Sequence, residues 1–254
     1  MTAPARPRRR AKRGEGERLR AEILVAAREL LAETQDADAL TVRSVAERVG
    51  VSTPSIYLHF ADKAALLDAV CEAVFADLDS LMEEAASTTQ DPFEGLRLRG
   101  IAYARFALAN PEQYRLAMMT MPGRHDLGKT ALMYEDIVVG QTYGNLMGAV
   151  QRCIDVGVFA PGTNAQQVAT TLWAAAHGAV SLCLAKPDLA GDDAEALCAL
   201  VIEHAGMGAA LSSYVGGHSH ADAATDHDHE NMSASLAALL KFLGQMSAEN
   251  QQQS

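Results

Sequence analysis

The 254-residue sequence lacks the patterns that mark most enzymes, disulfide-rich proteins and metal sites. It has no nucleophile–base constellation, no phosphate-binding glycine loop and no H-E-x-x-H pair of helical metal ligands. We therefore expect no catalytic site, no metal site and no cofactor. The four cysteines are scattered and form no C-x-x-C, which favours reduced, half-buried thiols over a redox or metal role. Runs of β-branched residues are few and Ala and Leu abundant, so the composition predicts an all-α protein.

The sequence also lacks a convincing signal peptide or membrane span. The basic residues at 6–13 are followed by no apolar stretch of the kind that a signal sequence requires. The 18 residues from Val168 to Ala185 carry no formal charge and approach the length of a spanning helix. They include polar side chains and many alanines, however, so we predict a buried helix at a subunit interface. The expected protein is cytoplasmic and has no membrane partner.

Residues 41–50 have the features of a short helix that ends at a turn. Thr41 is a candidate N-cap, because its hydroxyl can accept a hydrogen bond from a free N–H of the first turn. Gly50 follows the last apolar position, where a helix end favours a residue that tolerates positive φ. Apolar residues recur at the spacing of one helix face between the two: Val42, Val45, Ala46 and Val49.

A second short helix is predicted directly after this turn. Ser52 can cap it, and Pro54 fits its first turn, where a missing N–H does no harm. Ile56 and Phe60 form an i, i+4 apolar pair. Hydrogen-bonding side chains are left for another face: Thr53, Ser55, Tyr57 and His59. Such a helix suits the major groove of DNA, although an ordinary helical hairpin with a polar outer face has the same pattern.

The ending SIYLHFADK resembles the DNA-binding domain of the TetR family of bacterial transcriptional repressors. The family pattern closes with Tyr, one residue, His-Phe and a Lys three residues later, here Tyr57, His59, Phe60 and Lys63. The intervening position, often a second Tyr in the family, is Leu58. The resemblance covers residues 19–68 and implies a homodimer on a palindromic operator. The implied DNA-binding residues are Thr41, Arg43, Ser52, Thr53, Pro54, Ser55, Tyr57, His59 and Lys63, with Thr41, Arg43, Tyr57 and Lys63 on phosphates.

The distribution of charge fits this interpretation. The net charge is −11, but residues 1–60 carry +3 and the other 194 carry −14. Residues 1–17 form a basic arm that is expected to be disordered in isolation and able to follow phosphates or enter the minor groove. An acidic remainder discourages non-specific contact with DNA elsewhere on the protein.

The chain divides into predicted domains at changes of composition. The basic arm (1–17) precedes a DNA-binding domain (18–85), in which a helix over 18–34 leads to the helical pair and Asp62 caps a long helix from Lys63. A ligand-binding and dimerisation domain (86–215) follows, then a His/Asp-rich linker (216–231) and an amphipathic helix with its tail (232–254).

The ligand-binding domain is predicted to be helical throughout. Helices are expected over Pro92–Ala109, after the Asn110-Pro111 break, over 129–156, over Asn164–Ala185 and over Asp192–Tyr214. Gly140, Gly144 and Gly148 recur every four residues, which implies close approach by another helix or a ligand. By family resemblance, the last two helices form a four-helix bundle with a second subunit.

An unidentified small lipophilic effector is the expected ligand of this domain. The resemblance implies that effector binding favours a spacing of the two DNA-binding domains that does not match DNA. Trp173, His177 and Gly178 also resemble a Trp–His–Gly motif of one TetR subgroup. The predicted pocket residues are apolar with a few polar groups: Tyr103, Phe106, Met118, Tyr134, Tyr143, Met147, Trp173 and His177.

A metal-responsive alternative depends on the His/Asp-rich linker. Four histidines and four acidic residues within 216–231 are ligand types suited to Zn²⁺ or Ni²⁺, although a solvated linker is the default for such a segment. This hypothesis predicts that chelators change DNA binding and that deletion of residues 216–231 abolishes the response. The resemblance implies a repressor, but activation stays open, because the position of the binding site at a promoter decides between the two.

Overall fold

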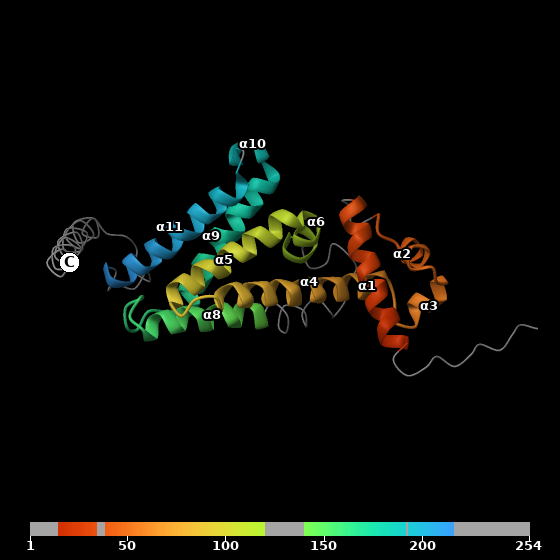
Figure 1. Cartoon of the computed structure of the whole chain (residues 1–254), viewed down its shortest axis with the longest axis horizontal. Helices are drawn as coiled ribbons and strands as arrows, with labels where there is room; N and C mark the ends of the chain where they lie inside the picture. Colours follow the sequence, from red (N-terminus) through yellow and green to blue (C-terminus); the bar gives the residue numbers. More distant parts are fainter. Residues whose placement is uncertain (1–14, 35–38, 120–139, 192, 216–254) are drawn as a thin grey trace, which may run out of the picture. The chain divides into compact units, whose positions relative to one another are not determined.

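The computed structural model describes residues 15–34, 39–119, 140–191 and 193–215, and in this part of the chain the regular elements are all helices. The predicted all-α class is therefore confirmed. The elements, labelled in Figure 1, are α1 (Glu15–Thr34), α2 (Val42–Val49), α3 (Thr53–Tyr57), α4 (Lys63–Ala86), α5 (Pro92–Ala109), α6 (Pro111–Tyr114), the π-helix η1 (Arg115–Met119), α8 (Gly140–Asp155), α9 (Ala165–Ala185), α10 (Pro187–Ala190) and α11 (Ala194–Val215).

Contacts group the chain into two compact units. The first unit comprises Met1–Glu84 and Ala102–Gly144, and the second comprises Ala85–Ile101 and Asn145–Ser254. Helix α5 is therefore divided between them. Compactness does not define function, so the predicted arm, DNA-binding domain, ligand-binding domain, linker and tail stay predictions.

In the first unit, α1, α2 and α3 gather at one end of α4 (Figure 1). Apolar side chains of these helices form the core, and its fully buried members include Ile23, Leu31, Val45, Ile56, Leu66, Val70 and Val74. Near the end of α4, Leu81 is 43% exposed, whereas its neighbour Met82 is only 6% exposed. The start of α4 is as predicted, because Asp62 Oδ1 accepts a hydrogen bond of 2.8 Å from the backbone N–H of Ala65.

The predicted break at Asn110-Pro111 is also present. Helix α5 ends at Ala109, and the side-chain amide of Asn110 donates 3.0 Å to the carbonyl of Phe106, which lies in the last turn of α5. After α6 the backbone continues as the π-helix η1, a geometry that the sequence did not reveal. The rings of Tyr103 and Tyr114 pack edge to face at 6.0 Å and link α5 to α6.

Arg28 connects three helices of the first unit. Its Nε donates 2.9 Å to Oε1 of Gln113 in α6, and one terminal nitrogen donates 2.6 Å to Oδ2 of Asp77 in α4. Gln113 is 8% exposed and pairs with this guanidinium. Because a buried amide costs stability unless it is hydrogen-bonded, the contact helps to fix α6 against α1.

In the second unit, α9 and α11 run side by side and are joined through α10 (Figure 1). Their bounds agree closely with prediction, and Asn164 caps α9 by accepting 3.1 Å from the N–H of Gln167. The thiols of Cys183 in α9 and Cys198 in α11 lie 3.8 Å apart. All four cysteines are free and buried, more fully than the half-burial expected for them.

For the glycines of α8, the sequence predicts close approach by another helix or a ligand. A methyl group built at Gly144 would meet no atom of the described chain within 4 Å, and at Gly148 only an Arg152 nitrogen at 3.8 Å. No described helix of this chain therefore approaches Gly144 or Gly148 closely, and approach by a ligand or a second subunit stays a prediction. The close contact lies elsewhere, at Gly100 of α5, where a methyl group would stand 2.8 Å from the side chain of Ile202 in α11.

Candidate nucleic-acid interface

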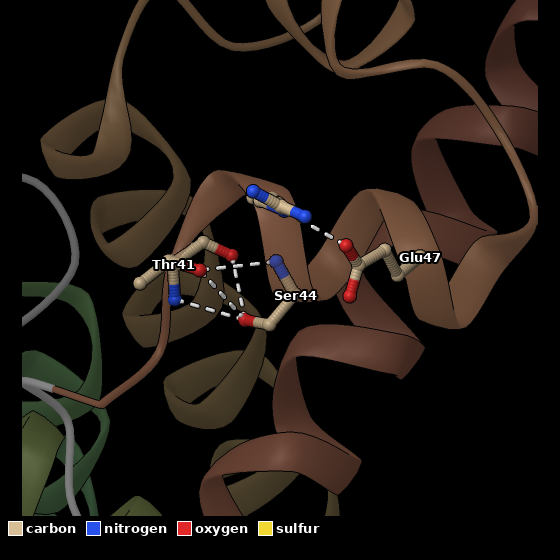
Figure 2. Close-up of polar contacts among 4 residues, drawn as sticks. Thr41, Ser44 and Glu47 are labelled. Carbon is tan, nitrogen blue, oxygen red and sulfur yellow. Dashed lines mark hydrogen bonds and ion pairs between the residues drawn. The ribbon is translucent and has the colours of Figure 1, made fainter.

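Helix α2 begins at a reciprocal capping box. Thr41 Oγ1 accepts 3.0 Å from the N–H of Ser44, and Ser44 Oγ accepts 3.0 Å from the N–H of Thr41. Figure 2 shows these contacts at the start of the helix. The predicted cap at Thr41 is confirmed. Two backbone donors that a helix start leaves free are thereby satisfied, which fixes where α2 begins.

Gly50 ends α2 in the left-handed conformation that the sequence predicts. Its φ is 76° and its ψ is 32°. The N–H of Gly50 bonds to the carbonyls of Ala46 and Glu47, and the N–H of Val51 donates 2.9 Å to the carbonyl of Ala46. The helix therefore closes within one residue and the chain turns sharply into α3.

The cap predicted at Ser52 is correct in position and wrong in contact. Ser52 has the extended backbone of an N-cap, and Pro54 lies in the first turn of α3, but the Ser52 hydroxyl makes no capping bond to the backbone. Its oxygen lies 2.8 Å from the hydroxyl oxygen of Ser55. The Ser55 hydroxyl competes with the backbone N–H groups for the Ser52 hydroxyl, so the Ser52–Ser55 side-chain pair forms in place of the cap.

Helix α3 is short and firmly anchored. It contains five residues, and the N–H groups of His59 and Phe60 both reach the carbonyl of Ile56, so the chain turns directly after Tyr57. Ile56 is fully buried and Phe60 is 3% exposed, so the predicted apolar pair is confirmed even though only its first member is helical. Burial of both side chains sets which face of α3 points outward.

The start of α1 lies beside the segment that follows α3. The guanidinium of Arg20 stands 5.2 Å from the centre of the Phe60 ring, within cation–π range. A methyl group at Gly16 would come within 3.8 Å of the His59 ring. The N-terminal end of α1 therefore adjoins the outward-facing residues of the α3 region.

The predicted DNA-binding residues differ in exposure. Tyr57 is 51% exposed, and Leu58, absent from that prediction, is 75% exposed. The other exposed members of the set are Thr41, Arg43, Ser52 and Pro54, and the half-buried members are Thr53, Ser55, His59 and Lys63. Five of them lie in or directly before α3, so the structure gathers them on one short element. Their role as DNA contacts stays a prediction.

Ion pairs engage the arginines of α2. Arg43 Nε lies 2.9 Å from Glu47 Oε1, and this hydrogen bond, drawn at the labelled Glu47 in Figure 2, raises the pKa of Arg43. Arg48 Nη2 lies 2.5 Å from Glu33, which holds α2 against α1. The Arg43 side chain is 83% exposed, so exchange of Glu47 for a phosphate needs no repacking.

Of the predicted pocket residues, those up to residue 144 belong to the first unit and those from residue 145 to the second. Tyr103 and Phe106 are buried, and Met118, Tyr143, Met147, Trp173 and His177 are half-buried. Burial lowers the pKa of His177, which favours a neutral imidazole. Tyr134 lies outside the described residues. The pocket as a site stays a prediction.

Metal binding finds no support in the described part of the chain. Among those residues, no three or more His, Cys, Asp or Glu side chains are arranged to hold an ion. The His/Asp-rich segment 216–231, the basic arm up to residue 14 and the tail from residue 232 lie outside the described ranges.

Helices α9 and α11 are both long and apolar enough, by length and composition alone, to cross a membrane. Within the structure, 33% of the tested window of α9 and 17% of that of α11 are buried. The core helices of soluble proteins meet the same test, so it does not identify a span.

A capped helix, a left-handed glycine turn and a short outward-facing helix define a helix-turn-helix, the unit with which many proteins enter the major groove. Family models agree with this class. Residues 23–70 match "Bacterial regulatory proteins, tetR family", and residues 96–205 match "Tetracyclin repressor-like, C-terminal domain". The chain therefore belongs to the TetR family of bacterial transcriptional regulators, which are soluble DNA-binding proteins and not enzymes.

Individual relatives show how far the similarity extends. The tetracycline repressor protein class A from transposon 1721 of Escherichia coli is 49% identical over 55 residues, which is 22% of this chain and 25% of the repressor. A solved protein of unknown function from Rhodococcus sp. RHA1 has 25% identity and a TM-score of 0.64, over 81% of this chain and all of that one. FadR from Bacillus subtilis, solved with stearoyl-CoA, has 19% identity and a TM-score of 0.62, over 74% and 98%.

The sequence matches are partial. The chain spans 25% to 55% of the length of the curated relatives that it matches. The structural matches at low identity show the shared fold.

Proposed function

We propose that the protein is a cytoplasmic, homodimeric repressor that binds a palindromic operator and is released by a small lipophilic effector, without catalysing a reaction. The observation that carries the proposal is the α3 region, in which buried Ile56 and Phe60 hold Tyr57 outward with 51% of its surface exposed. The phenol ring of Tyr57 is exposed to solvent while its buried neighbours fix the backbone, so the ring can contact a phosphate or a base edge.

The contacts to DNA divide by position. Thr41, Arg43, Tyr57 and Lys63 bind phosphates and set the position of the helix-turn-helix on the duplex. Ser52, Thr53, Pro54, Ser55 and His59 face base edges or the nearest phosphate. The Thr41 hydroxyl also caps α2, so its loss weakens the helix as well as the contact.

The N-terminal arm adds affinity that depends on salt. Its six basic residues, within 6–13, precede a helix whose first turn adjoins His59. Each phosphate that a Lys or Arg neutralises releases counterions, so affinity falls as salt rises. Deletion of residues 1–13 is expected to weaken binding to all sequences and to flatten the salt dependence, with little effect on sequence preference.

Dimerisation is assigned to α9 and α11. Both helices leave large apolar side chains in water: Leu182 (46% exposed), Leu200 (48%), Met207 (55%) and Tyr214 (56%). Removing such surface from water is favourable by about 25 cal/mol per Å². A second copy that presents the same two helices covers these residues in a four-helix bundle.

The effector is assigned to the ligand-binding domain. Supporting it are the apolar character of the predicted pocket residues, the neutral imidazole favoured at His177, and the similarity in fold to the FadR that was solved with stearoyl-CoA. Release follows from linkage. An effector that binds better to the state that does not match the operator weakens DNA binding, and DNA weakens effector binding by the same factor.

A gel shift with the DNA flanking the gene of this protein tests the proposal. A specific complex with two or four chains, weakening steeply with salt, is expected. Tyr57→Ala is expected to lower the affinity for DNA at least about a hundredfold, because a hydrogen bond to a charged group contributes about 1.5–3 kcal/mol and the dimer loses two such bonds. The dimer should persist in sedimentation.

Val25→Ala, at a position of α1 that is 55% exposed, serves as the control for removal of an exposed apolar side chain, and Tyr57→Phe isolates the hydroxyl. If Tyr57→Ala leaves both binding and dimerisation intact, α3 does not read DNA and the proposal is wrong. A reporter gene placed behind the bound site then separates repression from activation, since the two shift expression in opposite directions when the regulator is deleted.

A further inference from the structure

The outermost side chain of the α3 region is apolar. Leu58 is 75% exposed, more than any other large hydrophobic residue in the described part of the chain. It stands two residues after Ile56, which is fully buried. At about 100° per residue, the two side chains therefore lie on opposite sides of the helix. Leu58 has right-handed helical dihedrals (φ −73°, ψ −19°), so this geometry applies to it.

A second apolar residue shares this outer face. Pro54 also lies two residues from Ile56, on its N-terminal side, and is one helical turn before Leu58. The hydrogen-bonding side chains occupy the flanks, with Tyr57 on one side and the Ser52–Ser55 hydroxyl pair on the other. The centre of the outward face is thus a Pro54–Leu58 ridge, whose side chains neither donate nor accept a hydrogen bond.

When a short helix enters the major groove, side chains on its outward face can reach base edges, and phosphate contacts position the helix on the duplex. Base edges in that groove present polar donors and acceptors, except for one apolar group, the C5-methyl of thymine. Leu58 has no hydroxyl with which to hold a phosphate, although the family pattern often places a tyrosine there. A leucine at the centre of the face is therefore matched to a methyl group and mismatched to every other major-groove edge.

We propose that Leu58 is a specificity-determining residue that packs against the C5-methyl group of one thymine in each half-site of the operator. The inference rests on the proposed DNA-binding function and adds a base preference to it. It assigns recognition to a residue outside the expected contact set and requires no movement of the core, because the side chain already lies in water.

Deoxyuridine substitution tests the assignment, because it removes the thymine methyl and leaves the hydrogen-bonding edge unchanged. The binding site is first selected from random duplexes with the full-length protein. Each thymine is then replaced singly and in symmetric pairs, and affinity is measured by fluorescence anisotropy. One substitution is expected to weaken binding about fourfold, the equivalent of one buried methyl, and a symmetric pair about fifteenfold.

The same scan with Leu58→Ala forms a double-mutant cycle. The variant should bind the thymine site several-fold more weakly than wild type and lose most of its sensitivity to uracil at the assigned position. Val25→Ala is the matched control, since Val25 is 55% exposed on α1, outside the α3 region, and its replacement should leave uracil sensitivity unchanged. Circular dichroism of Leu58→Ala should match wild type, because an exposed side chain contributes little to folding.

Three results would overturn the inference. Binding that is indifferent to uracil at every position shows that Leu58 reads no methyl group. Sensitivity that persists undiminished in Leu58→Ala assigns the methyl contact to another residue, such as Pro54. A selection that yields no preferred sequence removes both the inference and the proposed function, whereas the first two results leave the proposed function standing.

Discussion

Alanine substitutions at Gly50 and Gly144 should change stability in opposite directions. In both cases the new methyl group meets no described atom within 4 Å, so steric clash contributes nothing. Gly50 has a φ of 76°, and the left-handed region costs other residues about 1–2 kcal/mol. The reduced freedom of the unfolded chain offsets about 0.4–1 kcal/mol of this. Gly50→Ala is therefore expected to destabilise by about 1 kcal/mol.

Gly144 instead lies within α8 (Gly140–Asp155). Alanine there removes the entropic cost of an interior glycine and should stabilise by about 0.8–1 kcal/mol. The two variants should thus differ by about 2 kcal/mol, although each adds the same methyl group. Gly50→Asn is the matched control, because asparagine tolerates the left-handed region better than alanine does.

Thermal unfolding followed by circular dichroism measures the difference. For chains of this size, 1 kcal/mol corresponds to a change in Tm of about 2–4 °C. Native-state amide exchange of peptides from α2–α3 and from α8 then assigns each effect to its element. Equal signs for the two substitutions would refute the reasoning. If both substitutions destabilise, the added methyl group at Gly144 meets a second subunit or a ligand that approaches α8, as the glycine spacing predicts.

Other substitutions test the caps, the core and the ionisable groups. Thr41→Ala should cost about 1 kcal/mol in urea unfolding, and Thr41→Ser should retain the cap. Ile56→Ala should cost about 2–5 kcal/mol, because it empties a fully buried position. Burial lowers the pKa of His177 in the folded protein, so the unfolded chain binds more protons as the pH falls through about 6.5. Stability should then decline from pH 7.5 to 5.5, and His177→Gln should show a shallower decline in Tm. Burial also raises the pKa of Cys153 to about 11 and of Cys198 to about 12, so an aromatic disulfide reagent should label neither in the native protein at pH 7.5 and both in guanidinium.

Local interactions made much of the fold predictable. The caps at Thr41 and Asp62 and the left-handed Gly50 each depend on residues within one helical turn, and all three are confirmed. Ser52 shows the limit of such reasoning. Its position predicts a cap, but the competing hydroxyl of Ser55 becomes visible only when both side chains are placed.

Contacts between distant segments left no signal in the sequence. The approach of Gly100 to Ile202 joins residues about a hundred positions apart, whereas the evenly spaced glycines of α8 predict close approach at another helix. The π-helix after Tyr114 has no distinctive composition. The sequence alone does not mark Leu58 as a DNA contact, because its place at the centre of an outward face depends on where α3 ends and on which side Ile56 is buried.

The indole of Trp173 gives the protein an optical reporter that needs no chemical label. It is the only tryptophan of the chain, it is half-buried in α9, and it belongs to the second unit, whereas α3 belongs to the first. Emission excited at 295 nm, roughly the red edge of tyrosine absorption, therefore comes from one known position. Candidate effectors can be titrated on that emission while DNA binding is followed on a dye-labelled duplex. Effector binding and DNA binding are then measured at separate wavelengths in the same sample.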